Sequence, residues 1–155
     1  MGIFDPQQII IFLQLLLAVF LGSIVGIERE YLGKAAGVRT FALVSLSACL
    51  FTIISRDGFS SFVGQPGVSL NPAQLAGSVI TGIGFLGAGL IIFRGMKIEG
   101  LTTASGLWTV TAIGMAVACK LYLIAVFTTL LVVAIFAGLR IINLEKIFGL
   151  GDKEE

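Results

Sequence analysis

Five apolar stretches of about twenty residues follow one another along this chain, and they constrain its fold more than any other feature. A helix of about 20 residues spans the hydrocarbon core of a bilayer. The chain is 57% hydrophobic and 12% charged, and soluble domains carry about twice that share of charge, roughly 25%. A soluble fold of 155 residues has too little interior to bury so much apolar surface. The sequence therefore predicts an all-α integral membrane protein.

The apolar stretches predict a single domain, residues 1–142, formed by a bundle of about five transmembrane helices. The predicted spans are residues 7–27, 38–55, 73–93, 101–119 and 121–139. Residues 143–155 are charged and interrupted by glycine, so we expect a short tail without a folded C-terminal domain. Lys120 is the only polar residue at the fourth joint, which leaves one long bent helix there as an alternative. Whether the third span is continuous also stays open.

The basic residues orient the predicted bundle. If all five stretches span the membrane, one side carries eight basic residues: Arg29, Lys34, Arg39, Arg94, Lys97, Arg140, Lys146 and Lys153. Only Arg56 and Lys120 fall on the other side. Because cytoplasmic loops are enriched in Lys and Arg, the N-terminus is expected outside and the C-terminus in the cytoplasm.

A glycine-rich run, GIGFLGAG from Gly82 to Gly89, lies in the third span. Glycine in a helix interior costs about 1 kcal/mol relative to alanine, and in membranes close approach between helices compensates. The glycines expected to pack against other helices are Gly22, Gly26, Gly82, Gly84, Gly87 and Gly89. We expect the first, third and fourth spans to form the packed centre, and the fifth to face lipid or a second copy.

Polar residues at the basic ends of the spans form the candidate site. They are Glu28 at the end of the first span, Arg39 and Thr40 at the start of the second, Arg94 after the third, and Thr102, Thr103 and Ser105 at the start of the fourth. A carboxylate there can pair with an arginine, and hydroxyl groups can cap free amides. The alternative is that these charges only anchor the spans at the membrane interface. Arg29, Glu30, Lys34 and Lys97 are expected to be solvated loop charges.

Composition excludes several function classes. A net charge of +1 without a basic run argues against nucleic acid as a partner, and the chain has no histidine. The two cysteines, Cys49 and Cys119, match no metal or disulfide spacing. Glu28 is the only acid close to the membrane at the basic end, so a dedicated Mg²⁺ site is poorly supplied with ligands. Without a nucleophile and base pair, we expect neither an enzyme nor a cofactor.

Several linked motifs resemble one known family. They are GxxxGxER from Gly22 to Arg29, AGVRT from Ala36 to Thr40, the glycine run with Arg94 after it, and GLTTAS from Gly100 to Ser105 followed by Trp108. Over residues 15–120 the chain looks like the N-terminal membrane domain of the MgtC/SapB family. Many relatives carry a cytoplasmic domain of the ACT type, which is not expected here. The family often has an acidic residue and an arginine around the proline that follows Asn71, and this chain has neither.

The resemblance implies a multi-pass protein of the bacterial inner membrane, associated with growth at low magnesium, virulence and intracellular survival. It implies a regulator that acts through contacts inside the bilayer, on ATP synthase or on the membrane potential. The alternative is a small ion transporter or channel, with Mg²⁺ as one candidate ion. Besides the bilayer itself, the expected partners are a second copy of the chain or another membrane protein such as ATP synthase.

Overall fold

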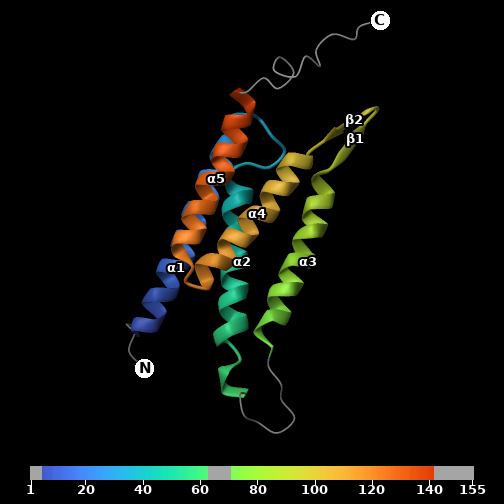
Figure 1. The fold of residues 1–155 in the computed structure, drawn as a ribbon. Coiled ribbons are helices and arrows are strands. Elements are labelled where there is room, and N and C mark those ends of the chain that lie inside the picture. The colour runs from blue at the N-terminus through green and yellow to red at the C-terminus, as the bar shows by residue number, and fades with distance from the viewer. Residues whose placement is uncertain (1–4, 63–70, 142–155) are drawn as a thin grey trace, which may run out of the picture.

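The computed structural model describes residues 5–62 and 71–141, which form five α-helices with a small β-hairpin (Figure 1). The helices are α1 (Pro6–Tyr31), α2 (Val38–Asp57), α3 (Pro72–Leu90), α4 (Leu101–Ala118) and α5 (Tyr122–Ile141), with a 3₁₀ turn, η1 (Ser60–Phe62), after α2. The strands are β1 (Ile92–Arg94) and β2 (Lys97–Glu99). The predicted fold class, a helical membrane bundle, is confirmed: α1 to α4 are long and apolar enough to cross a membrane. The tail predicted at residues 143–155 lies outside the described residues.

Two helices start with the same local signal, a polar cap followed by proline. The Asp5 carboxylate accepts a hydrogen bond of 3.0 Å from the Gln7 amide at the start of α1. The Asn71 side chain accepts one of 3.0 Å from the Ala73 amide at the start of α3. These caps satisfy amides that have no acceptor inside the helix, and proline fits the first turn because it has no amide hydrogen. Asn71 is therefore a capping residue.

The third span is a continuous helix, but its predicted end at Phe93 is wrong. Helix α3 stops at Leu90, and the chain turns into an antiparallel hairpin in which Phe93 faces Ile98. The hairpin loop is Gly95 and Met96, and Gly95 has a φ of +60° that L-residues rarely adopt. Branched and aromatic residues on both sides of such a turn favour strands. The apolar run was thus continuous in sequence but not in secondary structure.

The joint between α4 and α5 is a tight turn rather than a bend in one long helix. Helix α4 ends at Ala118, and Lys120 takes a left-handed conformation with φ +62°. Helix α5 then runs back along α4 and α1 (Figure 1). The left-handed residue ends the helix because it breaks the repeating hydrogen-bond pattern. Two separate helices therefore form here.

Helices α1, α2 and α4 form the centre of the bundle, so the expectation that the third span belongs to it is wrong. Helix α4 touches every other helix (Figure 1). Small residues allow this packing: a Cβ at Gly22 would lie 2.7 Å from the Phe41 carbonyl oxygen, and one at Gly114 would collide with the Ser45 carbonyl. Phe41 and Leu107 are fully buried between these helices. The centre is held by backbone contacts that only glycine permits.

The outer surface of the bundle is strongly apolar. Leu123 and Phe127 on α5 are 87% and 62% exposed, and Phe85 on α3 is 81% exposed. Such large exposed apolar side chains are typical of a surface in contact with lipid rather than water. Helix α3 lies at the edge of the bundle, where one of its sides packs against α4 and α2 (Figure 1).

Candidate functional site

A buried arginine marks the end of the bundle where α1 stops and α4 begins. Arg29, in the last turn of α1, is only 5% exposed. Its Nη2 donates a hydrogen bond of 3.2 Å to the hydroxyl of Thr103, in the first turn of α4. The guanidinium carbon lies 4.5 Å from the ring centroid of Phe136 on α5, within the range of a cation–π contact. Arg29 therefore joins three helices at this end.

The buried arginine is only partly neutralised. Its Nη1 lies 3.4 Å from Oε2 of Glu28, a longer separation than the 2.7–2.9 Å typical of charge-assisted hydrogen bonds. The Nε atom of Arg29 and Oε1 of Glu28 have no hydrogen-bond partner among the residues that the structure describes. Buried polar atoms without a partner are rare and costly. We refer to Glu28, Arg29, Thr103 and Phe136 as the Arg29 cluster.

Two hollows open beside the Arg29 cluster. Their volumes are about 480 and 440 Å³, and both are lined by Arg29, Lys34 and Thr102. The first turn of α4 borders them, and its N-cap, Gly100, has no side chain that could cap the free amides. Gly100 has a φ of +87°, and a Cβ there would collide with the Leu90 carbonyl. The fold thus requires glycine at this position, and the first amides of α4 have no side-chain cap from it.

The predicted polar cluster is only partly assembled. Glu28 and Thr103 meet in the Arg29 cluster, and Thr102 borders the hollows. Five other predicted positions are exposed: Arg39, Thr40, Arg94, Ser105 and Trp108. Arg94 pairs with Glu99 at 3.4 Å inside the hairpin, and the Ser105 hydroxyl bonds to the Leu101 carbonyl of its own helix.

The arginine at the centre of the cluster is Arg29, so its assignment as a solvated loop charge is wrong. Arg39 starts the next helix and points to the exposed side. Glu30 is also more than a loop charge, because its Oε2 accepts a hydrogen bond of 2.8 Å from the Val38 amide and caps α2. Both outcomes follow from contacts between residues far apart in the sequence, Arg29 with Thr103 and Glu30 with Val38, which a linear sequence does not give.

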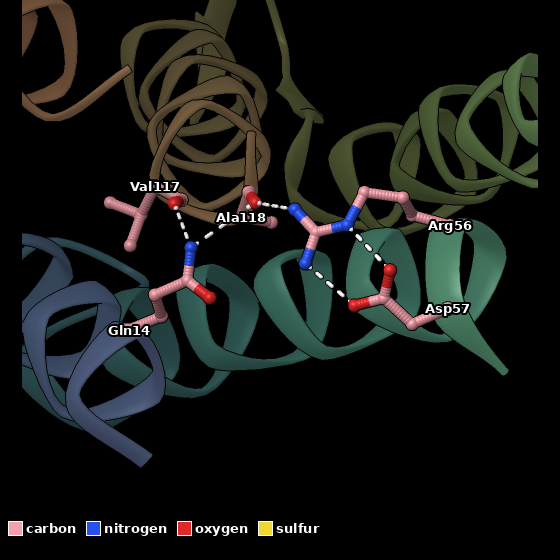
Figure 2. Close-up of polar contacts among 5 residues, drawn as sticks. All are labelled: Gln14, Arg56, Asp57, Val117 and Ala118. Carbon is pink, nitrogen blue, oxygen red and sulfur yellow. Dashed lines mark hydrogen bonds and ion pairs between the residues drawn. The ribbon is translucent and has the colours of Figure 1, made fainter. Parts of the chain in front are cut away.

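A second polar centre, at the opposite end of α4, was not predicted. Gln14, 2% exposed in the middle of α1, donates through Nε2 to the carbonyls of Val117 and Ala118, at 2.8 and 3.2 Å. Arg56 donates to the same Ala118 carbonyl at 2.5 Å and pairs with Asp57 at 2.6 Å. Figure 2 shows both side chains converging on the end of α4. The available signal was one glutamine inside a long apolar run, which is costly in a membrane unless it bonds.

The glycines of α3 lie in different environments. Gly87 faces α4, where an added Cβ would lie 3.7 Å from that of Ala104. A Cβ at Gly82, Gly84 or Gly89 would meet nothing within 4 Å. The expectation that these three pack against another helix of the same chain is wrong. By contrast, Gly22 and Gly26 of α1 lie against α2, where an added Cβ would meet backbone atoms at 2.6–2.7 Å.

An apolar groove of about 520 Å³ separates part of α3 from α2. Its lining includes Phe51, Leu75, Leu86 and Gly82. Ser47, Ser78 and Thr111 are the polar members of the lining. Within residues 5–62 and 71–141, no three His, Cys, Asp or Glu side chains lie close enough to hold a metal ion.

Comparison with known proteins connects this fold to one family. The model of the MgtC family matches residues 15–144 of the chain. The "Putative magnesium transporter YhiD" of Escherichia coli (strain K12) is 39% identical over 136 residues, which cover 84% of this chain and 63% of that protein. "Protein SrpB" of Synechococcus elongatus is 38% identical over 140 residues, with 82% and 75% coverage.

"Protein MgtC" of Brucella abortus (strain 2308) is 37% identical over 123 residues. These residues cover 79% of this chain but only 48% of the Brucella protein. The chain therefore spans about half to three quarters of the length of these three relatives. No solved structure matches the chain.

Proposed function

Because this chain belongs to the MgtC family, we propose that it is a bacterial inner-membrane protein that regulates another membrane protein through helix contacts inside the bilayer. The regulated partner is a proton- or ion-coupled machine such as ATP synthase, and the readout is the membrane potential or ATP synthesis at low magnesium. The link to magnesium is supported by the name of the Escherichia coli relative. The proposal includes no enzymatic activity.

The observation that carries this proposal is the outward face of α3. Gly77, Thr81, Gly84 and Ala88, which follow one another at intervals of four, three and four residues, share one side of the helix and are exposed. An added Cβ at Gly77 or Gly84 meets nothing within 4 Å. Glycine facing lipid keeps its helix penalty of about 1 kcal/mol without compensation. Close approach of a helix from another protein supplies that compensation.

The orientation of the bundle in the inner membrane is part of the proposal. Arg29, Lys34, Arg39, Arg94 and Lys97 lie at the end of the bundle where α1 and α3 finish, and Arg56 and Lys120 lie at the other. The positive-inside rule supports placing the Arg29 end in the cytoplasm and the N-terminus outside.

Site-specific photo-crosslinking in living bacterial membranes tests the regulator proposal. A benzophenone amino acid replaces Phe85, which is 81% exposed on α3 beside Gly84. The matched control places it at Phe127, which is 62% exposed on α5. We expect a defined membrane protein to be captured from position 85 and not from position 127.

A second variant separates specific docking from chance proximity. Gly84→Leu fills the exposed face of α3, whereas Gly138→Leu changes a helical glycine on α5 at which an added Cβ also meets nothing within 4 Å. Gly84→Leu should abolish the crosslink and the effect of the protein on membrane potential or ATP synthesis at low magnesium. Gly138→Leu should leave both unchanged. Crosslinks that join only two copies of this chain would refute the regulator proposal and leave α3 as a homodimer interface.

A second candidate function is ion transport, which the name of the Escherichia coli relative favours. Helix α3 is unbroken from Pro72 to Leu90, so it lacks the discontinuity that forms ion sites in many transporters. Flux measurements of Mg²⁺, H⁺ and K⁺ in proteoliposomes, over a range of voltages, test this candidate. Absence of flux for all three ions would reject it.

A further inference from the structure

The start of α4 and the buried arginine beside it have the features of an anion site. Because the Ala104 amide bonds to the Gly100 carbonyl at 2.9 Å, the amides of Leu101, Thr102 and Thr103 have no acceptor within the helix. The N-terminus of a helix carries a partial positive charge of about half an elementary unit. The residues that carry these amides all line the hollow of about 440 Å³, and Thr102 also lines the other.

Arg29 is an independent observation that points to a ligand. Arg29 is only 5% exposed, and it lines both hollows. Its Nε atom has no hydrogen-bond partner within the described part of the chain. Arg29 already reaches the first turn of α4 through Thr103. Lys34, exposed in the loop after α1, contributes a second positive charge to both hollows.

We propose that a phosphate group binds at the start of α4, between the Arg29 guanidinium, the Lys34 ammonium and the free amides of the first turn. Planar guanidinium groups and helix N-termini are both preferred partners of phosphate oxygens. The phosphate belongs either to the headgroup of an anionic phospholipid or to a soluble phosphate compound.

Two carboxylates limit the affinity of the site. Glu28 lies 3.4 Å from Arg29 and offsets part of its charge. Glu99 lines one hollow, but it pairs with Arg94 at 3.4 Å. Removing the charge of Glu28 should therefore strengthen phosphate binding, which a residue with only a structural role would not do.

The test uses the full chain in dodecyl maltoside micelles. In one arm inorganic phosphate is titrated by calorimetry, and in the other phosphatidylglycerol is added to delipidated protein and its retention is measured by native mass spectrometry. Binding of inorganic phosphate identifies a soluble compound as the source, and binding of phosphatidylglycerol alone identifies the lipid headgroup. Either result supports the site if the variants behave as follows.

Lys34→Ala should weaken binding about fivefold, the effect of about 1 kcal/mol for one lysine near a phosphate surface. The matched control, Arg39→Ala, removes an exposed positive charge at the same end, but Arg39 lines neither hollow. It should leave the affinity unchanged, and Glu28→Gln should raise it. No binding of either probe, equal weakening by Lys34→Ala and Arg39→Ala, or no gain from Glu28→Gln would each overturn the proposal.

Discussion

Adding one methyl group at two helical glycines should change stability in opposite directions. Gly114 on α4 lies against the backbone of α2, where an added Cβ would collide with the Ser45 carbonyl and lie 3.2 Å from the Ala48 Cβ. Gly84 on α3 has nothing within 4 Å of an added Cβ. The two substitutions, Gly114→Ala and Gly84→Ala, are the same chemical change in helix interiors. Any difference between them therefore reports packing alone.

The magnitudes follow from two competing terms. Alanine gains about 1 kcal/mol over glycine in a helix interior, and Gly84→Ala should keep most of it. At Gly114 overpacking adds a cost near the upper end of about 1–3 kcal/mol, because a carbonyl in a helix cannot rotate away. The net loss is about 2 kcal/mol, so the two variants should differ by about 3 kcal/mol in unfolding free energy.

Unfolding by sodium dodecyl sulfate in mixed micelles, followed by circular dichroism, measures this difference. Gly22→Ala serves as a second packed position, since its Cβ would lie 2.7 Å from the Phe41 carbonyl oxygen. It should destabilise in the same direction as Gly114→Ala. Equal stability of Gly114→Ala and Gly84→Ala would refute the assignment of α4 to the centre and of α3 to the edge.

Three further predictions concern the polar residues and the orientation. Arg29→Ala should lower the unfolding free energy by about 2 kcal/mol, because it leaves the partly buried carboxylate of Glu28 without its partner. Arg39→Ala should change the unfolding free energy by less than about 0.5 kcal/mol. Equal losses in the same unfolding assay would contradict the burial of Arg29. Gln14→Ala should lower the unfolding free energy by about 1–2 kcal/mol, because it removes two membrane hydrogen bonds of about 0.6 kcal/mol each and leaves a cavity. It should also speed amide hydrogen exchange at the end of α4. Unchanged exchange would argue that the Gln14 hydrogen bonds do not stabilise this helix end. Cys119 is exposed at the end opposite Arg29 and Cys49 is buried, so a membrane-impermeant maleimide added to spheroplasts should label only Cys119. Labelling that requires membrane disruption would reverse the proposed orientation.

Much of the fold could be predicted because it depends on local properties of the sequence. The five helices overlap the predicted spans, and the starts at 38 and 101 agree with the structure to the residue. Length and hydropathy decide whether a segment is stable in a bilayer as a helix, since every backbone group must bond within the segment. The hairpin after Leu90 was missed because Ile92 and Phe93 are as apolar as the helix before them.

The candidate site was predicted only in part. Glu28 and Thr103 lie in the Arg29 cluster, but the predicted partner of the carboxylate was Arg39 or Arg94 rather than Arg29. Gln14 and Arg56 were not among the predicted site residues. Four arginines follow a predicted span within two residues, namely Arg29, Arg56, Arg94 and Arg140. Sequence position therefore does not distinguish a buried guanidinium from a solvated one. The distinction depends on whether another helix packs against the turn that carries the arginine, as α4 does at Arg29 through Thr103.

By itself, the sequence determined that this chain is a helical membrane protein of the MgtC family, with small residues on several helices and basic residues gathered at one end. Only the tertiary structure decided that α1, α2 and α4 form the centre, that Arg29 is buried, and that Gly84 on α3 is exposed while Gly87 faces α4. The physical reason is that lipid tails are as apolar as a protein core. In a membrane, hydropathy places each helix in the bilayer but does not choose its neighbours, and backbone fit and a few polar contacts make that choice.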